Sequence, residues 1–404
     1  MNNIYSNIQN TSANIDSKTD WRLHEFSHPE RTIRLATSFS GIGAIEHSMH
    51  RLGLKCQIQF AGDIDANCKK AYFANYPISE AQWHTDVHDF DAKPYKGKID
   101  LFVGGAPCQA FSLRGKHGGF EDTRGTLFRE FARIVIECQP KVFIFENVKG
   151  MLSHDKGKTW KVIKNTFEND CDYDVYYQVL NGKDYGVPQS RERIYCIGFK
   201  KETDFKYPAP IPLVNTVYDY LQKQFEKKYL LKQKGVNFIT RSINYQKSYT
   251  QINGDILLCQ KRNQQFNWHG DFVFVDEVTA KKLGMPDMDK YFLSEKVRKY
   301  VLATGTKTFY SRPKTDLAVA RPLLTSMHKM HRAGVDNYIT RDGRIRKLAP
   351  RECLRLMGFS DTFKIVVPDT PMYQQAGNAI VVDVLVSILD SIKAAVPTLF
   401  SKEA

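Results

Sequence analysis

The sequence lacks several features that assign a chain to common protein classes. No two of its eight cysteines lie closer than twelve positions apart, which excludes a CxxC metal or redox motif and disfavours a disulfide framework. No apolar run approaches the roughly 20 residues of a membrane-spanning helix. The opening residues, MNNIYSNIQNTSANIDSKTD, lack the basic and apolar segments of a secretory signal. We therefore expect a cytoplasmic protein that neither enters a membrane nor holds a metal.

What the sequence has in excess is positive charge. Its 58 lysines and arginines outnumber 44 acidic residues, which gives a net charge of +14. Residues 203–345 hold 24 of the basic residues against 13 acidic ones and so contribute +11 of that excess. A charge this unevenly placed favours an acidic partner, most often nucleic acid, over the alternative of solubility alone.

The pattern of apolar residues predicts an α/β fold. From about residue 31, short strand-like runs alternate with stretches of helical spacing, as in a mostly parallel, doubly wound sheet. In such sheets, ligands bind at the carboxyl ends of the strands. The strand-like runs are 34–39, 56–65, 99–107, 141–148, 175–181 and 191–199, and the helix-like stretches are 44–53, 66–76, 125–139 and 159–170.

The same pattern divides the chain into four segments. Residues 1–30 form a polar arm that we expect to be disordered, and 31–203 form the regular α/β domain. Residues 204–345 have irregular short runs and predict a second, smaller domain. Regularity returns in 346–404 with the helix-like LAPRECLRLMGF and a long apolar helix over 378–396, which we expect to pack back on the first domain.

Chemically useful residues stand where the first predicted strands end. The turn SFSGIGAIE (38–46) has glycines that allow a ligand close to a helix N-terminus, although a plain tight turn is the alternative. The second strand ends in GDID, where Asp63 is a candidate for the ribose hydroxyls of a cofactor and Asp65 for a helix cap. Asp86, in HTDV, is a further candidate for this site, with a surface or capping role as its alternative.

A cysteine follows the third predicted strand. The stretch GGAPCQAFS places Cys108 after a proline at the exit of an apolar run, where side chains face a cleft rather than a core. The thiolate is the nucleophilic form of cysteine, and nearby positive charge favours it. Arg114 and Lys116 are close in sequence. The pattern predicts a nucleophile, and a small buried side chain is the alternative reading.

Charged residues also stand in the last two predicted strands. Glu146 ends the apolar run in FENV, where a buried carboxyl must be paired or hold a proton, and a protonated carboxyl suits a ring nitrogen. In QSRERIY, strand alternation predicts Gln189, Arg191 and Arg193 on one face, beside Glu146 and Cys108. The alternative for Glu146 is a salt bridge in the core, and the alternative for the two arginines is a charged edge strand.

Taken in their order along the chain, these motifs resemble the cytosine-5 DNA methyltransferases, especially the bacterial enzymes of restriction–modification systems. The resemblance rests on FSGIGA, DID, PCQAFS, ENV, QSRERIY, LAPRECLRLMGF and QQAGNAIV, over about 31–200 and 346–390. It implies an α/β, Rossmann-like fold dependent on S-adenosylmethionine, with the basic middle as a smaller, irregular target-recognition domain. It also implies methyl transfer to carbon 5 of cytosine in double-stranded DNA.

The resemblance implies a role for each candidate residue. Cys108 would attack carbon 6 of a cytosine flipped out of the duplex, and Glu146 would bond ring nitrogen 3. Arg193 would hold the carbonyl at ring position 2, with Arg191 near the thiol. The loop 109–125 resembles the family's mobile catalytic loop. The implied cofactor contacts are Phe39, Gly41, Ile42 and Gly43 in the first turn, Asp63 on the ribose, Ile64 on the adenine face, Asp86 on the adenine amino group, and Leu127, Asn378 and Ala379 on the methionine side.

The resemblance also implies partners. These are a restriction endonuclease whose cleavage the methylation blocks, and nucleoid DNA in a bacterial cytoplasm, with the enzyme acting as a monomer. One alternative is a tRNA cytosine-5 methyltransferase, against which stand the large basic middle and Cys108, where that branch more often has threonine. The other is a DNA-binding relative without catalysis, against which stands the presence of all four catalytic candidates. The sequence indicates neither the target site nor the base that removes the carbon-5 proton.

Overall fold

A computed structural model of the chain describes residues 31–107, 127–222, 229, 250–252, 255–259, 270–275, 320–321 and 344–401. Cys108, the loop 109–125, the arm 1–30 and most of 204–345 lie outside the described residues. The described residues fall into two compact units. One holds the chain up to Asn181, then Glu192–Pro210 and the chain from Ile380, and the other holds Gly182–Arg191 and Ile211–Ala379. The division at 30, 203 and 345 stays a prediction.

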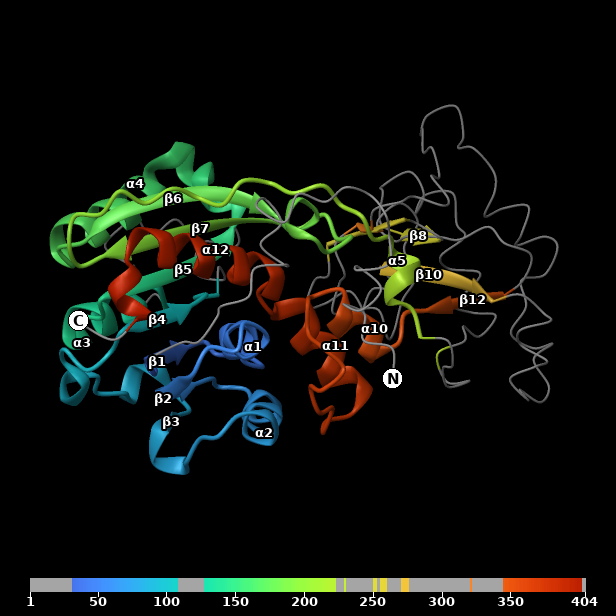
Figure 1. Cartoon of the computed structure of the whole chain (residues 1–404). Helices are drawn as coiled ribbons and strands as arrows, with labels where there is room; N and C mark the ends of the chain where they lie inside the picture. The colour runs from blue at the N-terminus through green and yellow to red at the C-terminus, as the bar shows by residue number, and fades with distance from the viewer. Residues whose placement is uncertain are drawn as a thin grey trace. The chain divides into compact units, whose positions relative to one another are not determined.

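The first unit is built on a seven-stranded sheet, shown from blue to light green in Figure 1. The strand order is β3-β2-β1-β4-β5-β7-β6, and neighbours are parallel except that β7 runs antiparallel to both β5 and β6. The apolar runs predicted six of these strands and missed β3, which has only two residues. The strands are β1 Ile33–Ser38, β2 Cys56–Gly62, β3 Trp83–His84, β4 Leu101–Gly104, β5 Val142–Val148, β6 Asp174–Asn181 and β7 Glu192–Phe199.

The helices of this unit lie where helical spacing predicts them, with one correction. The predicted helix over 378–396 begins only at Val382, because another helix, α11, ends at Asn378 and the backbone at Ala379 is extended. Asp65 caps α2, as predicted, by accepting a hydrogen bond from the Asn67 amide at 2.8 Å. The helices are α1 Ala44–Arg51, α2 Ala66–Asn75, α3 Leu127–Cys138, α4 Lys158–Asn165 and α12 Val382–Ala395.

A cluster of aromatic rings joins α3 to the middle of the sheet. Phe143 and Phe145 are two positions apart on β5 and so point to the same face of the sheet. Their rings contact Phe131 of α3, with centroid distances of 6.0 and 5.0 Å. Phe167 packs against both strand residues, at 4.6 and 5.6 Å. All four side chains are fully buried. This packing holds β5 in place as far as Phe145, so the residues at its carboxyl end follow directly from a rigid part of the core.

Ion pairs join elements of this unit that lie far apart in the sequence. Asp100, fully buried before β4, accepts hydrogen bonds from the backbone and side chain of Arg34 on β1, at 2.9 to 3.0 Å. Arg51 of α1 makes a two-pronged pair with Asp383 of α12, at 2.8 and 3.2 Å. A two-pronged arginine–carboxylate pair fixes orientation as well as distance. The C-terminal helix, red in Figure 1, is thereby anchored on α1.

The described part of the second unit consists of short elements. Two small sheets have the orders β12-β10-β8 and β11-β9. The buried Glu352 accepts the amides of Ala349 and Gln222, at 2.7 and 2.6 Å, and so ties the start of α10 to a distant segment. No helix among the described residues is long and apolar enough to cross a membrane. The elements are α5 Val217–Tyr220, β8 Thr250–Ile252, β9 Ile256–Leu257, β10 Gly270–Val275, β11 Ala320–Arg321, β12 Arg344–Lys347, α10 Pro350–Arg355 and α11 Asp369–Asn378.

Candidate active site

Most of the predicted site residues of the first unit lie at one edge of its sheet. Strands β1, β2, β3, β4 and β5 are parallel, so their carboxyl ends meet there. The register pairs Ser38 at the end of β1 with Gly104 at the end of β4, and Gly104 with Phe145. Because β7 is antiparallel, its first residues reach the same edge, and Arg193 pairs with Val148. The sheet therefore gathers residues from distant parts of the sequence.

The turn after β1 is held in a conformation that its glycines make possible. Phe39, Gly41 and Gly43 all have positive φ, at 56°, 55° and 77°, and Gly43 caps the start of α1. The Tyr76 hydroxyl donates to the carbonyls of Ile42 and Gly43, at 3.2 and 2.8 Å. A Cβ at Gly43 would lie 2.2 Å from the Tyr76 ring. The turn thus rests directly on Tyr76, and a Cβ at Gly41 would point into open space.

We expect Gly43→Ala to weaken S-adenosylmethionine binding by about tenfold or more and to cost roughly 1–3 kcal/mol of folding stability. The new Cβ is strained at this φ and displaces Tyr76, which releases the carbonyls that Tyr76 holds. Calorimetric titration and thermal unfolding measure the two effects. Gly53→Ala is the matched control, because Gly53 has φ 67° and nothing within 4 Å of an added Cβ. Unchanged cofactor binding in Gly43→Ala would show that this turn is not the cofactor cradle.

Asp63 links the ends of β1 and β2. One carboxylate oxygen accepts the Gly41 amide and the other accepts the Asp65 amide, both at 2.9 Å. Each carboxylate oxygen has a second lone pair, so Asp63 can hold the turn and accept from a ribose hydroxyl together. Its neighbour Ile64 has 75% of its surface exposed, which is unusual for an isoleucine in this unit and suits a side chain that packs on a ligand ring.

Asp86 follows the short strand β3. It caps a single helical turn, Val87–Asp89, by accepting the His88 amide at 3.0 Å, and the same oxygen contacts the His88 ring nitrogen at 2.8 Å. The hydrogen bonds from the His88 backbone and side chain lower the pKa of Asp86 below its ordinary value. The carboxylate is therefore ionised near neutral pH and acts as an acceptor only, as a contact to an amino group requires.

The remaining predicted cofactor contacts belong to different units of the structure. Leu127 is the first residue of α3 and packs partly buried against the aromatic cluster. Asn378 and Ala379 belong to the second unit, at the end of α11. There the buried Arg191 donates to the carbonyls of Gly377 and Ala379, both at 3.1 Å. Arg191 thus fixes the backbone on both sides of Asn378.

Glu146 and Arg193 meet at the end of β5. Arg193 Nε lies 3.2 Å from Glu146 Oε1, and both side chains are largely buried. This contact confirms the prediction that Arg193 lies beside Glu146. The single predicted face for Gln189, Arg191 and Arg193 is wrong in one respect, because β7 begins only at Glu192. The two earlier residues lie in the second unit, where Gln189 bonds the Leu356 carbonyl at 2.7 Å.

The chain that leads to Cys108 passes against the same carboxylate. A Cβ at Gly105 would lie 2.9 Å from Glu146 Oε2, so only glycine leaves room for the carboxylate there. The Asn147 side chain donates to the Ala106 carbonyl at 2.9 Å. Sequence reasoning missed both residues, although Asn147 stands in the FENV motif and Gly105 in GGAP. Cys108 itself lies outside the described residues, two positions after Ala106.

Glu46 is a buried carboxyl beneath this edge that the sequence did not reveal. It is 2% exposed on α1, and its Oε1 accepts from the hydroxyls of Thr37, at 3.2 Å, and of Tyr72. Its Oε2 has no hydrogen-bond partner among the described residues. Burial raises the pKa of Glu46 to about 7, against the hydrogen bonds from Tyr72 and Thr37. The only sequence signal was an acidic residue on the inward, apolar side of a short helix.

We expect the stability of the protein to fall as the pH rises through 7, and Glu46→Gln to reduce this fall. The folded pKa of about 7 lies above the ordinary 4.5, so this contribution to stability is fully present below pH 4.5 and is lost as the pH rises from there through 7, because the unfolded chain releases the proton first. Between pH 5 and 8 the variant should gain about 2–3 kcal/mol over the wild type. Denaturant unfolding at several pH values measures this difference. Glu80→Gln changes an exposed carboxylate, so its stability should fall with pH as that of the wild type does. A curve for Glu46→Gln that runs parallel to the wild-type curve would contradict the prediction.

The edge of the sheet gathers several groups that can bind a ligand. No three His, Cys, Asp or Glu side chains gather as potential metal ligands within the described ranges. The edge instead offers a backbone cradle after β1, two acidic acceptors after β2 and β3, and a paired carboxyl and guanidinium at β5 and β7. An adenosine-containing cofactor fits the glycine-containing turn, the acidic acceptors and the exposed Ile64 beside them.

Comparison with known proteins agrees with this geometry. The family model described as C-5 cytosine-specific DNA methylase matches residues 33–394. The type II methyltransferase M.HpaII of Haemophilus parainfluenzae is 33% identical over 353 residues, which is 85% of this chain and 84% of that protein. M.HhaI of Haemophilus parahaemolyticus, also a type II methyltransferase, is 32% identical over 356 residues, 87% of this chain and 92% of that protein.

Solved structures share the fold at low sequence identity. The S. pombe Dnmt2 methyltransferase superposes with a TM-score of 0.61 at 18% identity, over 89% of this chain and 98% of that one. The Entamoeba histolytica methyltransferase EhMeth gives 0.63 at 15% identity, over 90% and 99%. The fold is thus the Rossmann-like α/β fold of S-adenosylmethionine-dependent methyltransferases. Together with the family match over nearly the whole sequence, this shows that the chain belongs to the C-5 cytosine-specific DNA methylases.

Proposed function

We propose that this methyltransferase flips one cytosine out of a short duplex site and methylates it through a covalent bond from Cys108. The observation that carries the proposal is the Glu146–Arg193 pair, with the chain leading to Cys108 held against it by Asn147. A donor for a ring nitrogen, a cation for a ring carbonyl and a nucleophile are the three groups that cytosine carbon 5 needs. Glu146 and Arg193 lie at one edge of the sheet, and the described chain toward Cys108 ends beside them, where Asn147 bonds the Ala106 carbonyl.

The thiolate is needed because carbon 5 of cytosine is a poor nucleophile. Cys108 Sγ forms a bond to carbon 6, the ring double bond moves its electron pair toward carbon 5, and Glu146 donates a hydrogen bond or proton at nitrogen 3. Arg193 stabilises charge on the ring carbonyl at position 2. Carbon 5 then forms a bond to the transferred methyl carbon, and the electron pair of the bond that this carbon loses stays on the donor's sulfur. A base, water or side chain, takes the proton from carbon 5, the double bond reforms, Glu146 takes back any proton given to nitrogen 3, and the thiolate leaves carbon 6.

The chain's own residues would hold the methyl donor at the edge of β1, β2 and β3. S-Adenosylmethionine supplies the methyl group when bound. The Phe39–Gly43 turn would receive its polar end, Asp63 the ribose hydroxyls, Ile64 the adenine face and Asp86 the adenine amino group. Leu127, Asn378 and Ala379 would close the methionine side, with Arg191 fixing the backbone around Asn378. The exposed Ile64 and the positive φ angles of the turn support this assignment.

The position of Glu146 supports the proposal of base flipping. Glu146 is 9% exposed at a sheet edge, and a base stacked inside a duplex cannot bring its ring nitrogen to such a group. Extrusion costs a few kcal/mol, which contacts in the pocket offset. We assign closure over the flipped base to the loop 109–125 and reading of the duplex to the basic segment 204–345. A cognate restriction endonuclease and action as a monomer complete the proposal.

The decisive experiment is to express the protein in a host without cytosine methylation and to bisulfite-sequence the host DNA. Protected cytosines confined to one short motif are the expected result. They would give the recognition site, and the presence of an endonuclease that cuts the same motif can then be tested. Absence of protected DNA cytosines, from protein that still binds S-adenosylmethionine, would overturn the DNA substrate and leave a tRNA substrate or binding without turnover.

A further inference from the structure

The segment that carries Asp86 is weakly held by the sheet. Strand β3 pairs with β2 through only two residues, Trp83 with Ala61 and His84 with Gly62. The following residues form one helical turn over Val87–Asp89 and leave the sheet. A side chain at the start of such a segment keeps a fixed position only if other contacts supply the rigidity.

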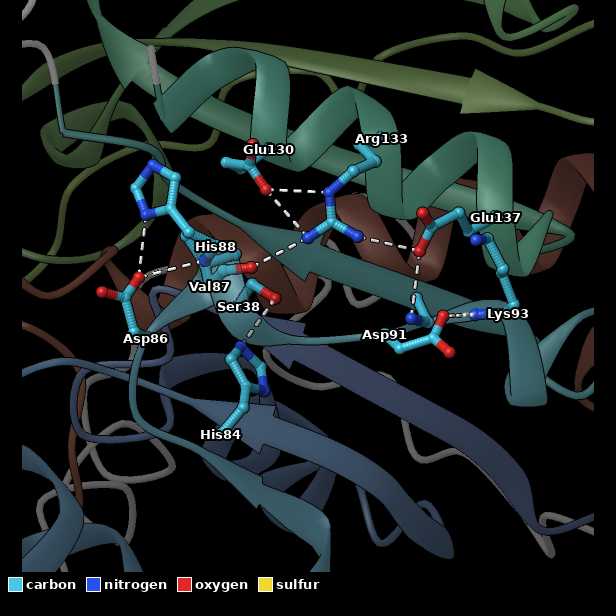
Figure 2. A network of polar contacts seen from close by, with 11 residues as sticks. Ser38, His84, Asp86, Val87, His88, Asp91, Lys93, Glu130, Arg133 and Glu137 are labelled. Carbon is cyan, nitrogen blue, oxygen red and sulfur yellow. Dashed lines mark hydrogen bonds and ion pairs between the residues drawn. The ribbon is translucent and has the colours of Figure 1, made fainter. Parts of the chain in front are cut away.

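One arginine of α3 supplies these contacts. Arg133 Nη2 donates to the carbonyl of Val87 at 2.8 Å (Figure 2). Val87 directly follows Asp86 in the chain. Its other nitrogens contact Glu130 and Glu137, both at 2.8 Å. Glu137 in turn accepts the Ala92 amide at 3.0 Å. The segment is thus fastened to α3 near both of its ends.

This network differs from an ordinary helix-surface ion pair. Pairs at i,i+3 and i,i+4 contribute only about 0.2–0.5 kcal/mol each. Here the two glutamates also fix the rotamer of Arg133, so its fork is already aimed at a main-chain carbonyl of another element. Helix α3 is itself rigid, since Phe131, Ile134 and Val135 are fully buried. Helix α3 therefore holds the segment that carries Asp86 through polar contacts, alongside the burial of Val87 in the core and the stacking of Phe90 on His84.

We propose that Arg133 is a positioning residue for cofactor recognition, which holds Asp86 where it selects the amino group of adenine. The inference rests on the proposed contact between Asp86 and adenine. Arg133 touches neither cofactor nor substrate in this assignment. It acts through the Val87 carbonyl, and Glu137 acts with it through the Ala92 amide.

The test compares S-adenosylmethionine with its analogue that carries hypoxanthine, which has a carbonyl in place of the adenine amino group. Calorimetric titration of the wild type should show a preference for the natural cofactor of about tenfold or more. In Arg133→Met, affinity for S-adenosylmethionine should fall about tenfold and the preference should shrink to about twofold. At saturating cofactor the variant's kcat should stay within about twofold of the wild type, since no reacting group has moved.

Two further variants sharpen the comparison. Arg133→Lys keeps the charge but can reach only one partner at a time, so it should lie between the wild type and Arg133→Met. It also provides the result if the methionine variant does not fold. Lys164→Met is the matched control, because Lys164 of α4 makes an i,i+4 pair with Glu168, which lies in the helical segment directly after α4 and far from Asp86 in the sequence. It should leave both affinities unchanged.

Asp86→Ala separates failure of this inference from failure of the proposed contact. If Asp86→Ala abolishes the preference for adenine and Arg133→Met does not change it, the inference is overturned and the Asp86 contact stands. If Asp86→Ala itself leaves the preference intact, the proposed contact is wrong and the inference falls with it. When both hold, the double variant should bind no more weakly than Asp86→Ala alone, because both changes remove one contact. Additive losses would overturn the inference.

Discussion

Replacing Cys108 by serine is expected to abolish methyl transfer while leaving the binding of DNA and of S-adenosylmethionine in place. A serine hydroxyl is not ionised near neutral pH, so no bond to carbon 6 forms and carbon 5 is not activated. The loss should be about 10⁴-fold or more, the scale of removing a nucleophile. Transfer of a labelled methyl group to DNA measures the rate, and a mobility shift measures binding. Transfer that survives in Cys108→Ser would overturn the assignment of the nucleophile.

A mechanism-based substrate makes the same prediction visible as a covalent product. With 5-fluorocytosine at the target position, the carbon-5 substituent cannot leave as a proton, so the double bond cannot reform and the thiolate cannot depart. The wild type should then give an adduct that withstands denaturing electrophoresis, and Cys108→Ser should give none. Cys56→Ser is the matched control, because Cys56 is a partly buried cysteine at the start of β2, the strand end away from the site. It should form the adduct like the wild type.

Replacing Glu146 by glutamine is expected to lower the single-turnover rate by about 10²–10⁴-fold, with affinity for S-adenosylmethionine unchanged. The amide can still reach a ring nitrogen but cannot transfer a proton or carry the charge that pairs with Arg193, 3.2 Å away. Rapid quench with the enzyme in excess over DNA separates this step from product release. The alternative that Glu146 is only a core salt bridge predicts lower stability and an unchanged rate.

The neighbouring acidic residue provides a matched control for this prediction. Glu192 directly precedes Arg193 in the chain, but its exposed carboxylate pairs with Lys149 at 2.9 Å rather than with the site. Glu192→Gln should therefore change the rate by no more than about twofold. Equal losses in the two variants would point to general disturbance of the start of β7 rather than to chemistry at Glu146.

Most strands, and the order of the motifs along the chain, could be predicted from the sequence because both depend on local patterns of residues. An apolar run of four or more residues, as at Val142–Phe145, favours a buried strand, and an acidic residue before a helix, as at Asp65, satisfies amides that the helix leaves open. Cys108 and Glu146 were identified in the same way, since each stands where an apolar run ends. These signals need no knowledge of what packs against them.

The remaining features depend on which segments meet in space. The two residues of β3 carry no pattern of their own and become a strand only because β2 offers a free edge for pairing. The contact between Arg193 and Glu146 follows from the antiparallel register of β7 on β5, and Arg191, two residues earlier, is drawn to the backbone around Asn378 instead. Alternation along one strand cannot show where that strand begins.

The sequence alone thus determined the fold class, the family and the residue types of the site, because apolar periodicity and short motifs are encoded locally. Only the tertiary structure decided that Glu46 is buried, that Gly105 lies against Glu146 and that Arg133 fastens the Asp86 segment to α3. The physical reason is that burial and hydrogen-bond partnership are properties of pairs. In the Arg133 network the partners lie about 45 residues apart, and no pattern within either segment specifies the other.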